Sequence, residues 1–351
     1  QVIHFMWKKG IIIFFIAAMN LQGIGQFSTL ENTIPLPLFS KNNVINISFH
    51  ADFKKILNDR GEEPRYHDAL LYFPKNGDTL TFNIKLKVRG NFRKNPETCG
   101  FPPLRVKFTD KNQLENTIFQ GQKKLKLVTH CNKEEELLQE YLLYKVYQLF
   151  TQKSFRVRLI RATYQDKNQF FEPFTRFAFF IEDDDDMAER NGGKSEDIED
   201  FERREAVAMI DSQHVRLIHI FQYMIGNTDW NIERGKNFKY IYYKDNDMII
   251  PVPYDFDLSG IIDVTYPNIE SVFGSGGYNH RQYKNICSTK NEIQKLLKTF
   301  RKNRKHIKKT YRDFPFLSEK KKNEIWKYYR KFYFKSRWKS KKIFTGGCKN
   351  R

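Results

Sequence analysis

Cysteine is scarce in this sequence, and its placement excludes a common kind of site. The 351 residues include four cysteines, at positions 99, 131, 287 and 348, and none stands in a CxxC or HxxxH pattern. Zinc sites use such closely spaced pairs, so this spacing fits none of them. No internal repeat or low-complexity linker is present either, so the sequence gives no clean cut into independent domains.

Acidic residues are the minority among the charged side chains. There are 61 Lys and Arg against 41 Asp and Glu, a formal net charge of +20 that is concentrated toward the C-terminus. Such an excess favours nucleic acid, anionic lipid or phosphorylated ligands as partners. No zinc finger, RNP-like motif or recognition helix accompanies the lysine runs, so we disfavour nucleic acid and interpret the excess as a solvated basic face.

Long hydrophobic runs are missing, with one exception near the start. Met6 to Gly10 form a short basic stretch, followed by the apolar run IIIFFIAAM. This pattern is typical of a secretory signal peptide and is short for a membrane span of ~20 residues. We expect residues 1–26 to be a signal peptide with Met6 as its true start, and the protein to be exported to the periplasm, cell surface or outside. A retained anchor is the alternative, and no later segment predicts a span.

Export would allow the cysteines to form disulfides. Four cysteines permit three pairings, and we expect Cys99 to pair with Cys131 because both fall in the N-terminal half near strand ends. The apolar fraction of 40%, with 15% aromatics, predicts a chain that folds around a sizeable core.

The periodicity predicts an ordered series of elements. Alternation of apolar and polar residues indicates strands, and apolar residues at helical spacing indicate a long helix between them. The order is strand, loop, strand, strand, helix, strand, strand and acidic connector, which is that of a kinase N-lobe. We therefore predict an α+β, atypical two-lobed protein-kinase-like fold, with a β-rich N-terminal lobe over 27–185 and a mainly helical C-terminal lobe over 186–351. The main predicted strands are 82–88, 104–108, 123–130, 154–164 and 171–182, and the predicted helices are 132–150, 200–210 and 211–226.

The stretch from Gly226 to Asp257 contains the residues best suited to chemistry. Phosphoryl transfer needs one carboxylate to orient the attacking hydroxyl and others to hold Mg²⁺ against the phosphates. We assign Asp229 as the base, Asp255 as the main metal ligand, Asn237 as the second and Asp257 as an added contact, since Mg²⁺ prefers oxygen ligands. The structural alternatives are a turn cap for Asp229, a hairpin residue for Asn237 and a bend for Asp255.

Nucleotide phosphates also need a cation, usually a strand lysine held by a glutamate of the next helix. Lys126 with Glu140 is the pair we predict, and Lys107 is its rival. No GxGxxG is present, so the loop RGNFRKN with Arg89 would cover the phosphates. A solvated edge lysine and an arginine that stabilises the fold are the alternatives. The acidic run 182–186 is interpreted as a solvated linker, in which Glu182 alone could touch a nucleotide.

These motifs resemble a known family. GNTDWNIERGKNF followed by PVPYDFD is similar to the catalytic block of HipA-type and CotH kinase-like proteins, and VRGNFRKN, FPPLRVKF and KLKLVTHC resemble the CotH side more closely. The similarity covers about 87–263. It implies an atypical kinase that phosphorylates serine on secreted or coat proteins, with Asp229, Asn237 and Asp255 at the family's catalytic and metal positions. Trp230 and Asp257 depart from the common kinase pattern.

Together these observations predict an exported CotH-like kinase. It would transfer the γ-phosphoryl group of ATP, with Mg²⁺, to a Ser or Thr hydroxyl of a protein. The alternative is a catalytically silent surface or binding protein that keeps the same fold, and phosphorylation of a small molecule or glycan is a third reading.

Overall fold

A computed structural model describes residues 36–196, 211–262, 264 and 281–345 of the chain. The signal peptide predicted over residues 1–26 and the helix predicted over 200–210 lie outside these described residues. The described residues all belong to one structural unit. A boundary at residue 185 therefore stays a prediction.

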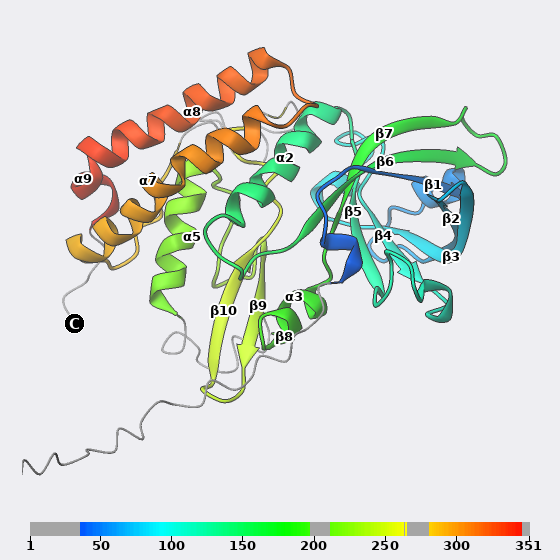
Figure 1. Cartoon of the computed structure of the whole chain (residues 1–351), viewed down its shortest axis with the longest axis horizontal. Helices are drawn as coiled ribbons and strands as arrows, with labels where there is room; N and C mark the ends of the chain where they lie inside the picture. Colours follow the sequence, from blue (N-terminus) through cyan, green and yellow to red (C-terminus); the bar gives the residue numbers. More distant parts are fainter. Residues whose placement is uncertain (1–35, 197–210, 263, 265–280, 346–351) are drawn as a thin grey trace, which may run out of the picture. The chain divides into compact units, whose positions relative to one another are not determined.

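A closed barrel of seven strands occupies the N-terminal half (Figure 1). The strands pair in the order β1-β2-β3-β4-β5-β7-β6, and β1 closes the barrel by pairing in parallel with β6, whereas the other neighbours are antiparallel. The strands are β1 Ile45–Ala51, β2 His67–Lys75, β3 Asp78–Val88, β4 Leu104–Phe108, β5 Lys124–Val128, β6 Val157–Asp166 and β7 Phe174–Ile181.

Strand alternation separates the barrel interior from its outer face. In β3 the apolar residues Phe82, Ile84 and Leu86 are buried, and the residues between them are less buried or exposed. Successive side chains of a strand point to opposite faces, so the apolar set fills the barrel while the polar set lies outside. The same rule places Arg105 of β4 beside its cross-strand neighbour Lys126 of β5.

A three-stranded antiparallel sheet and a group of helices make up the rest of the described chain. Strand β9 is the middle strand of this sheet, between β8 and β10. Helix α2 contacts strands β6 and β7 and also packs against α7. The remaining elements are α1 Phe53–Asn58, α2 Glu134–Tyr147, α3 Asp184–Arg190, β8 Lys194–Glu196, α5 Ser212–Ile225, β9 Phe238–Tyr243, β10 Met248–Pro253, α7 Lys290–Arg312, α8 Glu319–Trp338 and α9 Ser340–Phe344, with short 3₁₀ turns at Pro37–Phe39, Phe92–Lys94 and Asn112–Leu114.

The predicted α+β, two-lobed protein-kinase-like fold is wrong. The described chain instead contains a closed, mixed seven-stranded barrel with a separate small sheet and helices. Alternation indicates which face of a strand is buried, but an open sheet and a barrel share that pattern. Helix α2 was expected to belong to an N-terminal lobe, yet its buried residues share one core with α5, α7 and α8.

The structure bears on two sequence predictions: the disulfide between Cys99 and Cys131, and the lack of a later membrane span. Cys99 and Cys131 lie at disulfide distance, with Cα atoms 5.0 Å apart, as the sequence predicted. In the part of the chain that the structure describes, no helix is both long and apolar enough to cross a membrane.

Candidate functional site

One pocket of about 750 Å³ gathers most of the residues that the sequence singled out. It lies between the outer face of β4 and β5, the loop after β3, the loop after α5 and the segment after β10. Its lining includes Arg89, Lys126, Asp229, Asn237, Asp255 and Asp257. Glu140 does not line it but contacts Arg93, which does.

The small sheet explains why residues far apart in the sequence meet here. In the β9–β10 hairpin, Phe238 pairs with Pro253, so the residues just before and just after the hairpin are neighbours. The backbone N–H of Tyr254 donates to the carbonyl of Asn237 at 3.1 Å. A hairpin of this register therefore delivers Asn237 and Asp255 to the same edge of the pocket.

The start of the loop that carries Asp229 is held by local hydrogen bonds. Helix α5 is capped at its C-terminus by Gly226, whose φ of 72° is the left-handed conformation that favours glycine, and a Cβ there would collide with the Tyr328 hydroxyl. The Asp229 N–H donates to the Asn227 side chain at 2.9 Å. Trp230 is buried and its indole N–H donates to the Asn227 carbonyl at 3.0 Å. The carboxylate of Asp229 is thus presented by a rigid turn.

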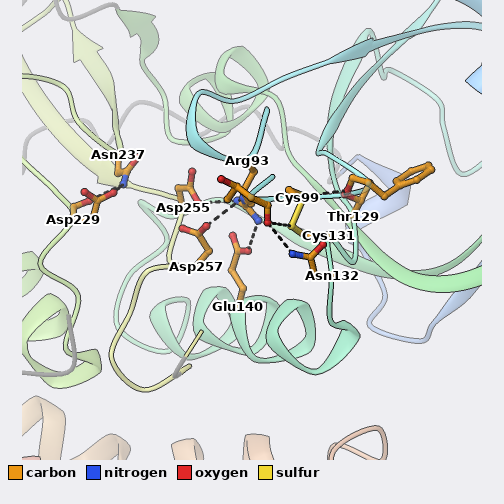
Figure 2. A network of polar contacts seen from close by, with 12 residues as sticks. Arg93, Cys99, Thr129, Cys131, Asn132, Glu140, Asp229, Asn237, Asp255 and Asp257 are labelled. Carbon is orange, nitrogen blue, oxygen red and sulfur yellow. Dashed lines mark hydrogen bonds and ion pairs between the residues drawn. A yellow bond between two sulfur atoms is a disulfide. The ribbon is translucent and has the colours of Figure 1, made fainter. Parts of the chain in front are cut away.

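Asp229 is held by two neighbours from the same loop. Lys236 forms an ion pair with it, and the amide nitrogen of Asn237 donates to its Oδ2 atom at 3.1 Å and to its backbone carbonyl at 2.6 Å. Figure 2 shows Asn237 beside Asp229 rather than beside Asp255. The sequence assigned Asn237 to the metal, whereas here its amide nitrogen orients the predicted base.

Two of the site residues adopt a strained backbone conformation. Asn237 and Asp255 both have a φ of 60°, in the left-handed region that non-glycine residues seldom occupy. The Asp255 N–H donates to the hydroxyl of Tyr144 on α2 at 2.8 Å, which helps to hold that conformation. Strained residues of this kind cluster at functional sites, where the surrounding structure over-determines them.

Arg93 stands at the centre of a cluster of three carboxylates (Figure 2). Its guanidinium lies 3.2 Å from Glu140, 2.9 Å from Asp255 and 3.3 Å from Asp257, and the side chain is 8% exposed. The disulfide supports this arrangement, because Cys99 follows the short turn that carries Arg93 and Cys131 precedes α2, which carries Glu140.

Burial disfavours the charged forms of two carboxylates in this cluster. Burial raises the pKa of Glu140 to about 7, although Arg93 opposes the shift, and nearby Asp255 adds to it. Burial likewise raises the pKa of Asp257 well above its usual range, with Arg93 opposing and Asp255 reinforcing the effect. These groups would gain from a further cation in their neighbourhood.

Lys126 is buried on β5 with 2% of its surface exposed, and its partner differs from the prediction. It forms an ion pair with Asp184 at the start of α3, so the predicted pair with Glu140 is wrong. Burial lowers the pKa of Lys126 to about 8, which Asp184 partly counteracts. Local pattern indicates that a strand lysine faces outward, but the acid that meets it comes from a segment far along the chain.

The acidic run is not a solvated linker, which corrects a second expectation. Asp183 caps α3 by accepting a hydrogen bond from the backbone N–H of Asp185, so the run forms the first turn of a helix. Acidic residues are favoured there by the helix dipole. Glu182 is buried and binds Arg190 at 2.9 Å, a structural ion pair.

Lys107, the rival cation, does not line the pocket. It is exposed on β4, 5.6 Å from the centre of the Tyr66 ring. The pocket instead contains cations that the sequence reasoning did not single out: Arg93, Arg105, Arg234, Lys236 and Lys239. Arg105 could have been found from strand alternation, since it lies on the same face of β4 as Lys107, and Arg93 stands within the RGNFRKN motif.

No protein-family model matches the sequence, and no curated protein matches it.

The donor set can be tested for Mg²⁺. Among the described residues, no group of three or more His, Cys, Asp or Glu side chains is placed to hold a metal ion. Mg²⁺ commonly uses one or two carboxylates together with substrate phosphates, and such a site needs no complete protein cage. Asp255 and Asp257 fit that requirement: burial and the neighbouring Asp255 raise the pKa of Asp257 well above its usual range, and a divalent cation beside the two carboxylates would favour their ionised forms.

Proposed function

We propose that the protein is an exported phosphotransferase that moves the γ-phosphoryl group of ATP to a Ser or Thr hydroxyl of a protein. The observation that carries the proposal is the charge of the pocket. Seven Lys or Arg residues line it together with three Asp residues. The basic residues suit a polyphosphate, and the carboxylates suit a metal cation or the proton of an attacking hydroxyl. The resemblance of residues 87–263 to CotH catalytic blocks supports the same activity.

The cations would bind the phosphates. Lys126 lines the pocket, and its ammonium group lies 4.8 Å from the centre of the Phe155 ring and 5.2 Å from that of the Tyr254 ring. Arg89 and Arg105 lie on the same side, and burial lowers the pKa of Arg89 while Asp255 opposes that shift. An anionic ligand would stabilise the charged forms of Lys126 and Arg89.

Asp255 and Asp257 would hold Mg²⁺, and Arg93 would position them. Bound there, the ion would neutralise charge on the phosphate oxygens. Arg93 contacts both carboxylates as well as Glu140 of α2, so it ties the metal-binding segment to the core. We therefore assign Arg93 a positioning role.

Asp229 would act on the acceptor. The acceptor oxygen attacks the γ-phosphorus, an O–P bond forms, the bond from phosphorus to the bridging oxygen of ADP breaks, and Asp229 takes the hydroxyl proton. Lys236 and Asn237 orient the carboxylate for this task.

A catalytically silent binding protein is the second candidate, and a specific observation favours it. Each proposed catalytic carboxylate already has a cationic partner within the chain: Lys236 for Asp229 and Arg93 for Asp255 and Asp257. Such self-satisfied charges can hold a pocket together without any turnover.

Nucleotide binding and phosphoryl transfer separate the two candidates. Purified protein is titrated with ATP with and without Mg²⁺, and transfer of labelled γ-phosphate is followed to itself and to a Ser/Thr-rich protein. Asp229→Asn should keep ATP binding and lose transfer, whereas Lys126→Met should lose binding. Asp245→Asn, an exposed acid in the β9–β10 turn, is the matched control and should change neither. Binding without transfer would support the silent protein, and absence of ATP binding would sink the phosphotransferase.

A further inference from the structure

Helices α7 and α8 hold most of the charge excess of the chain. They contain ten and eight Lys or Arg residues against one and two Glu, a net charge of +15 out of the +20 of the whole sequence. These helices are orange and red in Figure 1. None of their residues lines the phosphate pocket, so the charge is not explained by the proposed activity.

A shallow groove of about 510 Å³ runs along the C-terminal half of α8. Six Lys or Arg residues and three aromatic residues line it, and no acidic residue does. We call its central part, Lys331, Phe334, Lys335, Arg337 and Trp338, the basic-aromatic patch. The opposite face of α8 is anchored in the core by buried residues such as Tyr329 and Phe332, so the patch is presented on a fixed helix.

The aromatic members of the patch are unusually exposed. Phe334 is 61% and Trp338 67% exposed, more than any other large hydrophobic side chain in the described ranges. They are four residues apart, so they lie on the same side of the helix one turn from each other. Single exposed apolar residues are ordinary, but two adjacent ones among cations indicate a surface that binds something.

We propose that the basic-aromatic patch binds the surface of an anionic lipid membrane. Interfacial helices combine Trp and Phe, which enter the boundary between headgroups and acyl chains, with Lys and Arg, which contact the lipid phosphates. The patch has both features. Composition alone suggested that the basic residues form a solvated face, whereas this proposal gives them a membrane as partner. The proposal is independent of the proposed phosphotransferase activity.

Nucleic acid is the competing polyanion, and the geometry favours lipid over it. The guanidinium of Arg337 lies 5.2 Å from the centre of the Trp338 ring, so part of the ring surface that base stacking would use is already covered. The Trp338 ring can insert between lipids by its exposed edge, which does not require a free ring face. Phe334 and Trp338 have basic and no acidic residues around them in the groove, which suits a surface that is both anionic and apolar.

Vesicle sedimentation tests the proposal. The full chain is mixed with vesicles of phosphatidylcholine alone or of phosphatidylcholine with phosphatidylserine. The apolar run at residues 11–19 is present in every variant, so its contribution is a constant background. Lys331→Glu/Lys335→Glu should weaken binding to the anionic vesicles by at least about 25-fold, and Phe334→Ala/Trp338→Ala by at least about tenfold.

A matched variant separates the patch from net charge. Lys111→Glu/Lys124→Glu changes the net charge by the same amount at exposed positions of the barrel half and should bind almost as the wild type does. Trp338→Phe should keep binding but reduce the blue shift of tryptophan fluorescence that vesicles induce. Equal loss in both charge-reversal variants, wild-type binding that is no tighter to the anionic vesicles than to phosphatidylcholine alone, or tighter patch-dependent binding to DNA or RNA would each overturn the proposal.

Discussion

Replacing Arg93 with methionine keeps a side chain of similar length but removes the cation that Glu140, Asp255 and Asp257 share. The guanidinium is almost fully buried and lies within about 3.3 Å of all three carboxylates. The variant therefore tests whether this cluster holds the pocket together.

The magnitude follows from these contacts. One ion pair at such a separation is worth about 5 kcal/mol at an effective dielectric constant of about 20, before the cost of removing both ions from water is subtracted. Loss of one partner from a buried pair typically costs about 3–5 kcal/mol. Because protonation can relieve the remaining carboxylates, we expect Arg93→Met to lower the free energy of unfolding by about 3–5 kcal/mol above pH 7 and by roughly half as much near pH 5.

The direction of the pH dependence follows from the raised pKa of Glu140. Its pKa lies near 7 in the folded protein against 4.5 as the reference value. A group with a raised folded pKa contributes its full stability below the unfolded pKa, and that contribution is lost as the pH rises through the folded pKa. Arg93→Met lacks the cation that favours the ionised carboxylates. As the pH rises from about 5 to above 7, the variant should therefore lose more stability than the wild type.

Urea unfolding followed by circular dichroism at both pH values measures the effect. Arg234→Met removes an exposed arginine from the same pocket and should change stability by less than about 0.5 kcal/mol. Arg93→Lys keeps the charge but not the planar guanidinium group, so its loss of stability should lie between those of Arg93→Met and Arg234→Met. A loss below about 1 kcal/mol in Arg93→Met, or a loss that does not vary with pH, would refute the reasoning.

Three further expectations concern two backbone positions and one buried histidine. Gly226→Ala should lower stability by about 1–2 kcal/mol in thermal unfolding, because it adds left-handed strain and a collision with Tyr328, and an unchanged midpoint would contradict that geometry. Asn237→Ala should lose about 1 kcal/mol more than Asn237→Gly, since both remove the amide but glycine tolerates the φ of 60°; equal losses would mean that strain plays no part. Burial lowers the pKa of His214 to about 4 from 6.5, so the stability it contributes is complete above pH 6.5 and is lost as the pH falls toward 4. His214→Gln should reduce the loss of stability between neutral pH and about pH 5 by about 2 kcal/mol, and an unchanged pH profile would show that this histidine does not titrate on unfolding.

Part of the site could be predicted from the sequence because it is built from neighbouring segments. Asp229, Asn237 and Asp255 fall on the two sides of one hairpin, and the β9–β10 register brings its ends together. The outward direction of Lys126 likewise follows from alternation, whereas the pairing of Cys99 with Cys131, 32 residues apart, was expected because both lie near strand ends. Short-range pattern is sufficient for such features, because hairpins and strands are specified within a few residues of themselves.

The tertiary structure alone decided the barrel and the ionic partners. Closure depends on the parallel pairing of β1 with β6, and Lys126 meets Asp184 across 58 residues, while Arg93 meets Asp255 across 162. A local pattern states that a side chain faces outward or is buried, but it does not state which distant segment will cover it. The sequence by itself therefore determined most of the barrel strands, the long helix α2 and the hairpin that is flanked by Asp229, Asn237 and Asp255, but not helix α3. Packing of distant segments decided how the sheet closes and which charges meet.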